Sequence, residues 1–169
     1  MRWYWIDRLV EFESGRRAKA VKLVTLAEDY LHSHFPGYPV MPNSLVLEGM
    51  GQTAMLLACE AIGYAQLILL AKVPSARFFF DAVPGDALTY TVHLISLNDA
   101  GISATGTSHR GDRLQGEAEL LFARVADSRT IRQGPGVVRL VEMMHVLGAF
   151  SIGRAADGSR LTPPARLGK

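Results

Sequence analysis

Two residues of this sequence have side chains suited to acid–base chemistry, and a rigid loop separates them. His34 begins the loop and Glu48 follows it, and residues 34–42 contain three prolines and the single glycine Gly37. Each proline fixes its own φ angle and disfavours α geometry in the residue before it, so this segment cannot lie inside a helix. An imidazole and a carboxylate held at fixed positions can share acid–base work on a substrate. The pattern therefore predicts an acid–base pair.

Nearby polar residues are expected to support this pair rather than to react. Gln52 stands one helical turn after Glu48, which predicts a hydrogen-bond partner without a chemical role of its own. His32 and His34 are two residues apart, a spacing that would direct two imidazoles to one side of an extended segment. Because no third ligand is suitably spaced, we expect no metal.

A largely apolar segment follows the loop and predicts a long buried helix. From Asn43 or Ser44 to about Ile62 there are few polar gaps, which is typical of a helix that is packed on most of its sides. Asn43 and Ser44 are suitable N-cap residues, and Gly63 is a suitable C-cap. A helix of roughly 20 residues is about 30 Å long, so the rest of the domain must wrap around it.

Alternating and continuous apolar segments predict the sheet that surrounds this helix. The strand candidates are residues 18–26, 67–71, 76–80, 87–97, 102–109 and 113–125. Short glycine-containing segments at 98–101 and 110–112 favour antiparallel hairpins between the last three strands. One long helix with a strand meander predicts an α+β fold.

The character of the sequence changes after about residue 126. We expect residues 1–126 to form the α+β domain and residues 127–169 to form a C-terminal extension that is partly helical or disordered. Gly134, Pro135 and Gly136 indicate a linker, residues 137–150 predict a short amphipathic helix, and the glycines and prolines of the last residues indicate a frayed end.

The composition is that of a globular protein. Of 169 residues, 49% are hydrophobic and 20% are charged, and the formal charge is only +2. Without a basic run that contains aromatic residues, we expect no nucleic-acid binding. No apolar run is long enough to span a membrane, and no secretion signal is visible, so we expect a soluble cytoplasmic protein. Cys59 is the only cysteine, which excludes an intrachain disulfide, and we expect it to fill core volume.

A loose basic stretch lies in and just before the first predicted strand. It consists of Arg16, Arg17, Lys19 and Lys22. These residues predict either a solvated edge strand or a basic rim that attracts an acidic partner, an effect that salt would weaken.

Several motifs, taken in order, resemble one enzyme family. They are His34-Phe35-Pro36-Gly37 with Pro39-Val40 and Pro42, Leu47-Glu48 with Met50 and Gln52, Ala76-Arg77-Phe78, and Val83-Pro84-Gly85-Asp86. From about residue 5 to residue 125, their order and spacing resemble the 3-hydroxyacyl-acyl-carrier-protein dehydratases of the hotdog-fold class. The resemblance implies a curved antiparallel sheet around one long helix, homodimers that can assemble as trimers of dimers, and a substrate carried as a thioester on acyl carrier protein. It implies no cofactor.

The resemblance also implies roles for individual residues. His34 would remove the α-proton, and Glu48 would protonate the departing hydroxyl or hold the released water, giving a trans-2-enoyl thioester in fatty-acid or related acyl biosynthesis. His34 of one subunit would act with Glu48 of the partner subunit. Amide groups at Gly37, Asn43 and Ser44 are the candidates for stabilising negative charge on the thioester oxygen. The candidate tunnel-lining residues are Phe78, Phe79 and Phe80.

To act as an acid, Glu48 must hold a proton. Burial beside Leu47 and Met50 would raise the pKa of Glu48 by up to several units, whereas the nearby helix start favours the anion by about 0.3–1 kcal/mol. We therefore expect desolvation to prevail in a dry pocket. Within this resemblance, a glutamate rather than an aspartate at position 48 favours dehydration without isomerisation, although Pro39-Val40-Met41-Pro42 also resembles the bifunctional dehydratase/isomerase subtype.

The sequence departs from the family pattern in two places. Asn43 stands where a glycine is usual, and Phe79-Phe80-Asp81 replaces a segment that usually contains a basic residue and a proline. These changes suggest an alternative, a non-catalytic hotdog subunit that binds acyl carriers. A thioesterase on the same fold, which would direct an activated water at the thioester carbonyl, is a third hypothesis.

Overall fold

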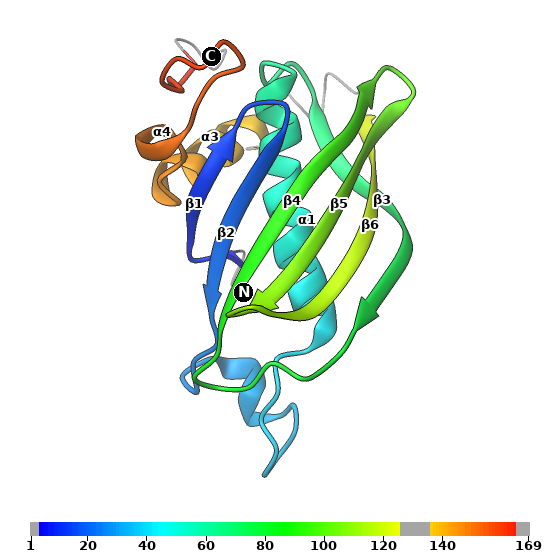
Figure 1. Ribbon diagram of the computed structural model, residues 1–169, viewed down its shortest axis with the longest axis vertical. Coiled ribbons are helices and arrows are strands. Elements are labelled where there is room, and N and C mark those ends of the chain that lie inside the picture. The colour runs from blue at the N-terminus through cyan, green and yellow to red at the C-terminus, as the bar shows by residue number, and fades with distance from the viewer. Residues whose placement is uncertain (1–3, 126–135, 165–169) are drawn as a thin grey trace.

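The computed structural model describes residues 4–125 and 136–164 (Figure 1). In this part of the chain the elements are β1 (Arg8–Glu13), β2 (Arg17–Leu23), the 3-10 helix η1 (Asp29–His32), α1 (Asn43–Ala61), β3 (Leu67–Phe78), β4 (Ala87–Asn98), β5 (Gly101–Arg110), β6 (Arg113–Val125), α3 (Gly136–Val146) and α4 (Ala149–Ile152).

The six strands form one antiparallel sheet that wraps around α1 (Figure 1). Their order is β1-β2-β4-β5-β6-β3, with hairpins joining β4 to β5 and β5 to β6 as predicted. The long central helix and the curved sheet confirm the predicted α+β hotdog fold.

Close packing between α1 and the sheet forms the core. Met50 and Leu57 of α1, and Tyr90 of β4, are fully buried. Gly49 lets the helix approach the sheet, because a Cβ at this position would collide with the ring of Tyr90 and lie 2.9 Å from the carbonyl oxygen of Trp5. The position of α1 is therefore fixed tightly near Glu48.

The start of α1 differs from the prediction. Pro42 is the N-cap residue, and no side chain caps the helix. The predicted caps Asn43 and Ser44 lie inside the first turn, and Asn43 Oδ1 instead accepts a hydrogen bond from Gln115 Nε2 at 3.5 Å. At the other end, Ile62 is the C-cap residue instead of the predicted Gly63, which follows it with a left-handed φ of +63°.

Two strands differ from the sequence prediction. β1 was not predicted, because its buried residues do not alternate regularly. Leu9 and Phe12 are three residues apart, yet both face the core, because a register shift after Leu9 adds a residue to the strand. The candidates at 67–71 and 76–80 form one strand, β3. Pro74 is tolerated there because β3 is an edge strand with irregular register near this residue.

The C-terminal extension covers the β1 edge of the sheet. The backbone N–H of Leu9 donates to the carbonyl of Leu147 at 2.8 Å, and that of Arg154 donates to the carbonyl of Phe12 at 2.8 Å. Leu161 is only 4% exposed, so the extension packs against the domain up to this residue. The prediction of a frayed end is therefore wrong for the residues up to Leu161.

The predicted helix at 137–150 is present as α3 and α4, which are separated by a short turn. The linker predicted from 126 lies, up to residue 135, outside the described residues, as does the end of the chain from residue 165. None of the helices in the described part of the chain is both long enough and apolar enough to cross a membrane.

Candidate active site

His34 lies on the loop that directly follows η1. Its backbone N–H donates to the carbonyl of Tyr30 at 3.0 Å, and its carbonyl accepts the N–H of Val40 at 3.0 Å, which closes the loop on itself. The half-buried imidazole has Nδ1 at 3.4 Å from the Val40 carbonyl oxygen. A proton on Nδ1 suits this contact and leaves Nε2 able to act as a base.

The three predicted amide donors are not used by the backbone. Gly37 has a φ of +78° within the turn of the loop, and within the described residues its N–H makes no backbone hydrogen bond. The same holds for Asn43 and Ser44, because they occupy the first turn of α1, where N–H groups have no helical partner. All three amides are available to a ligand.

Gln52 fixes the orientation of Glu48, so the predicted hydrogen bond between them is present. The Gln52 amide nitrogen donates to Glu48 Oε1 at 3.0 Å, and its amide oxygen accepts the backbone N–H of Trp5 at 2.9 Å. Gln52 is only 3% exposed. Because a backbone donor occupies the amide oxygen, the NH2 group must face Glu48.

The single chain does not provide the burial that was expected for Glu48 beside Leu47 and Met50. Its side chain is exposed, although Val46 and Met50 on other sides of α1 are fully buried. Leu47, beside it, is only half-buried. The dry surroundings expected for Glu48 therefore require another molecule over this side of the helix.

The three phenylalanines predicted to line a tunnel lie in different surroundings. Phe78 packs against the core, whereas Phe79 is 54% exposed. The ring of Phe80 lies under two guanidinium groups, with the central carbons of Arg110 and Arg113 at 4.6 and 4.5 Å from its centroid. A single chain thus does not enclose the three rings in one cavity.

The two departures from the family pattern are structurally connected. Gln115, which is fully buried, donates through Nε2 to the carbonyl of Phe80 at 2.9 Å and to the side chain of Asn43 at 3.5 Å. Asp81 accepts a hydrogen bond from the hydroxyl of Tyr38, on the His34 loop, at 3.3 Å. The exchanged residues therefore tie the segment after β3 to the loop and to the start of α1. Sequence reasoning missed Gln115, whose signal was a polar residue within a predicted strand.

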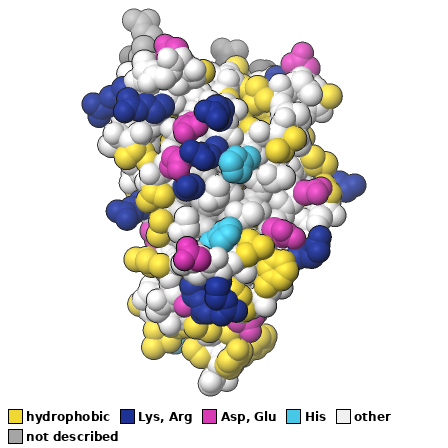
Figure 2. Space-filling model, in the orientation of Figure 1, with side chains coloured by type: hydrophobic (Ala, Val, Ile, Leu, Met, Phe, Trp, Pro, Cys, Tyr) yellow, Lys and Arg dark blue, Asp and Glu magenta, His cyan; other side chains and the backbone are white. Residues whose placement is uncertain are grey.

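The basic stretch is neither an edge strand nor a free rim. β2 lies between β1 and β4, Arg17 and Lys19 form ion pairs with Glu11, and Lys22 is buried. Figure 2 shows positive and negative side chains mixed on this face of the molecule. The expectation of an edge strand is therefore wrong, and acidic partners offset the charges of the expected basic rim.

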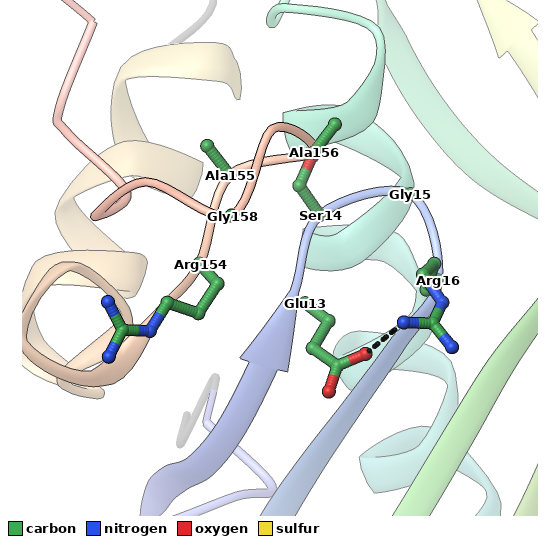
Figure 3. A pocket seen from close by; sticks show the side chains of 8 residues that line it. All are labelled: Glu13, Ser14, Gly15, Arg16, Arg154, Ala155, Ala156 and Gly158. Atoms are coloured by element: carbon green, nitrogen blue, oxygen red, sulfur yellow. Dashed lines mark ion pairs between the residues drawn. The ribbon is translucent and has the colours of Figure 1, made fainter.

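A pocket of about 560 Å³ lies elsewhere, between the β1–β2 turn and the C-terminal extension. Its lining residues are Glu13, Ser14, Gly15, Arg16, Arg154, Ala155, Ala156 and Gly158. Arg16 pairs with Glu13 at 3.0 Å, and Arg154 extends in another direction, so the two guanidinium groups do not converge on one ligand (Figure 3). Among the described residues, no group of three or more His, Cys, Asp or Glu side chains is placed to hold a metal ion.

Solved structures share this fold at low sequence identity. The protein smu.793 from Streptococcus mutans, bound to acetyl CoA, aligns with a TM-score of 0.60 and 13% identity over 74% of this chain and 93% of that one. A chain of the dehydratase heterocomplex ApeI:P from Xenorhabdus doucetiae aligns with a TM-score of 0.52 and 17% identity over 66% and 90%. At these identities the similarity concerns the fold alone.

Sequence comparison shows the family. The model of the FabA-like domain matches residues 3–111. The 3-hydroxyacyl-acyl-carrier-protein dehydratase FabZ of Desulforamulus reducens is 39% identical over 119 residues, covering 70% of this chain and 84% of the relative. FabZ of Chloroflexus aggregans is 40% identical over 119 residues, covering 70% and 83%. The chain therefore belongs to the FabA-like family, among the 3-hydroxyacyl-acyl-carrier-protein dehydratases.

Proposed function

We propose that this protein dehydrates a 3-hydroxyacyl thioester on acyl carrier protein to the trans-2-enoyl thioester, in fatty-acid or related acyl biosynthesis. The observation that carries the proposal is the pair of supported side chains. The loop holds the His34 imidazole with Nε2 available, and Gln52 orients the Glu48 carboxyl. The FabZ relatives, which are named for this reaction, support the same assignment.

In this reaction, Nε2 of His34 takes the α-proton, and the electron pair of that C–H bond forms the new double bond. The bond between the β-carbon and its hydroxyl breaks, and protonated Glu48 donates its proton so that water leaves. Amides of Gly37, Asn43 and Ser44 stabilise the negative charge that develops on the thioester oxygen. Each proton is accounted for by this chain's own residues, so the proposal includes no metal or cofactor.

The exposure of Glu48 supports a site built from two copies of the chain. The β3 edge of the sheet is unpaired within the described residues and carries Leu69 and Leu70, which are 50% and 38% exposed. The β1 edge, in contrast, is covered by the C-terminal extension. We therefore propose a homodimer joined along β3, in which His34 acts with the partner's Glu48, and a trimer of dimers as its possible larger assembly.

The proposed compartment is the cytoplasm. Cys59 is the only cysteine and is buried as a free thiol, as predicted, which is compatible with reducing conditions.

The proposal is tested by incubating the purified protein with a 3-hydroxyacyl thioester of acyl carrier protein. We expect trans-2-enoyl product, and His34→Ala is expected to abolish it. Free carrier thiol would indicate a thioesterase instead, and a cis-3-enoyl product would indicate an isomerase activity in addition. Unchanged substrate in the presence of a folded dimer would contradict catalysis and favour a non-catalytic carrier-binding subunit.

A further inference from the structure

A buried ion pair lies between β2 and the segment that leads to η1. Lys22 Nζ and Glu28 Oε1 are 2.7 Å apart, and the two side chains are only 4% and 2% exposed. Asp7 supports the pair, because its Oδ1 lies 3.3 Å from Lys22 Nζ and its Oδ2 accepts the backbone N–H of Leu23 at 2.6 Å. The ammonium group is thus shared by two carboxylates, one of which is fixed to the backbone of β2.

Stability alone does not explain this pair. Removing two charges from water is costly, and well-packed apolar residues of similar volume commonly stabilise a fold as well or better. A short charge-assisted hydrogen bond differs from apolar contact because it fixes direction as well as proximity. Lys22 is a firm anchor for such a bond, since β2 is paired along both sides, with β1 and β4.

The carboxylate held by Lys22 belongs to the residue from which η1 begins. Glu28 is the N-cap residue of η1, and its carbonyl accepts the N–H of Leu31 at 3.0 Å. Leu31 is only 3% exposed, and the carbonyl of Tyr30 accepts the N–H of His34 at 3.0 Å. A continuous series of hydrogen bonds therefore runs from Lys22 through η1 to the backbone of His34.

We propose that the Lys22–Glu28 pair, supported by Asp7, positions His34 for proton abstraction. The inference rests on the proposed function of His34. Lys22 and Glu28 are positioning residues, because the structure places them behind η1 and not at the imidazole. A catalytic group that is misplaced by about 1 Å can lose roughly 100-fold in rate, so a small shift of η1 is enough to lower turnover.

The test replaces both charges together. The double variant Lys22→Met/Glu28→Leu replaces both charged side chains with apolar side chains of similar volume. Because neither charge of the pair is left buried without its partner, the variant is expected to fold. We expect kcat to fall at least about 10-fold with KM little changed, because carrier binding does not depend on the imidazole position. The control is Lys19→Met/Glu11→Leu, which removes a partly exposed ion pair of 3.1 Å between β2 and β1 and is expected to leave kcat unchanged.

Hydrogen exchange supplies a readout that does not depend on turnover. In the double variant, the amides of Leu31 and His34 are expected to exchange faster than in the wild type, while the amides of α1 keep their protection. Uniform acceleration along the whole chain would show that the pair serves global stability and would overturn the proposal. If the double variant does not fold, Glu28→Gln provides the same test, because a neutral amide weakens the hydrogen bond to Lys22. Unchanged kcat together with unchanged exchange of the Leu31 and His34 amides in this variant would overturn the proposal.

The two proposals fail in different ways. A wild-type protein that forms no enoyl product contradicts the proposed function, whatever the variants do. A wild-type protein that is active, with a folded double variant of equal kcat, contradicts the positioning role alone.

Discussion

Replacing Gln52 with leucine tests whether this buried amide orients Glu48. The change leaves the backbone N–H of Trp5 without its acceptor and frees the Glu48 carboxyl from its 3.0 Å hydrogen bond. An unsatisfied donor of this kind costs about 1–3 kcal/mol. A domain of this size usually has a free energy of unfolding of about 5–15 kcal/mol, so Gln52→Leu is expected to fold. A free carboxyl spends less time in the productive position, and we expect kcat to fall about 10- to 100-fold.

The assay compares Gln52→Leu with the control Thr53→Val, using the rate of enoyl formation and urea unfolding of each variant. Thr53 is fully buried in the same helical turn, and its hydroxyl donates to the carbonyl of Gly49 at 2.8 Å without contact to Glu48. Loss of this bond is expected to cost about 1 kcal/mol of stability and to leave kcat near the wild-type value. A Gln52→Leu variant with wild-type kcat, or an equal loss of kcat in both variants, would show that Gln52 does not orient Glu48 for catalysis.

Three further predictions concern the core around α1. In Gly49→Ala, the new methyl group meets the ring of Tyr90 and the carbonyl of Trp5. The resulting strain of about 1–3 kcal/mol outweighs a gain in helix propensity of about 1 kcal/mol, so the urea midpoint of unfolding should fall. An unchanged midpoint would contradict this packing. Burial raises the pKa of the Cys59 thiol to about 12, so iodoacetamide should label Cys59 only after unfolding, and rapid labelling of the native protein would disprove its burial. Burial also raises the pKa of Glu60, so the folded state holds that proton more tightly than the unfolded state, and stability is lost as the pH rises through the folded pKa. Glu60→Gln should therefore be more stable than the wild type at neutral pH, but not at a pH below the pKa of Glu60 in the unfolded state. Denaturant unfolding at the two pH values measures this difference. An equal gain in stability at both pH values would argue against the titration of Glu60.

The elements with strong local signals could be predicted from the sequence. α1 runs over Asn43–Ala61, close to the predicted range, because an apolar run of this length has few alternatives to a buried helix. The hairpins that join β4, β5 and β6 followed from glycine-containing turns. β1 was missed because its register shift after Leu9 removes the strict alternation on which strand prediction depends.

Candidate site residues could be proposed from the sequence, but their surroundings could not. The motif indicated His34 and Glu48, and the spacing of one helical turn indicated Gln52. The second partner of Gln52 is the backbone of Trp5, and this contact has no signal in the sequence because it joins segments 47 residues apart. The exposure of Glu48 could not be predicted either, because the sequence of an apolar helix is the same whether its own sheet or another subunit covers a given side.

The measurement that tests the two-subunit site most directly is complementation between inactive variants. His34→Ala and Glu48→Ala subunits are unfolded together in equal amounts, refolded, and assayed for enoyl formation. Random pairing makes about half of the dimers mixed, and each mixed dimer has one intact pair out of two, so we predict about one quarter of the wild-type activity. No activity above that of either variant alone, in a sample shown to contain mixed dimers, would contradict a site shared between His34 and the partner's Glu48.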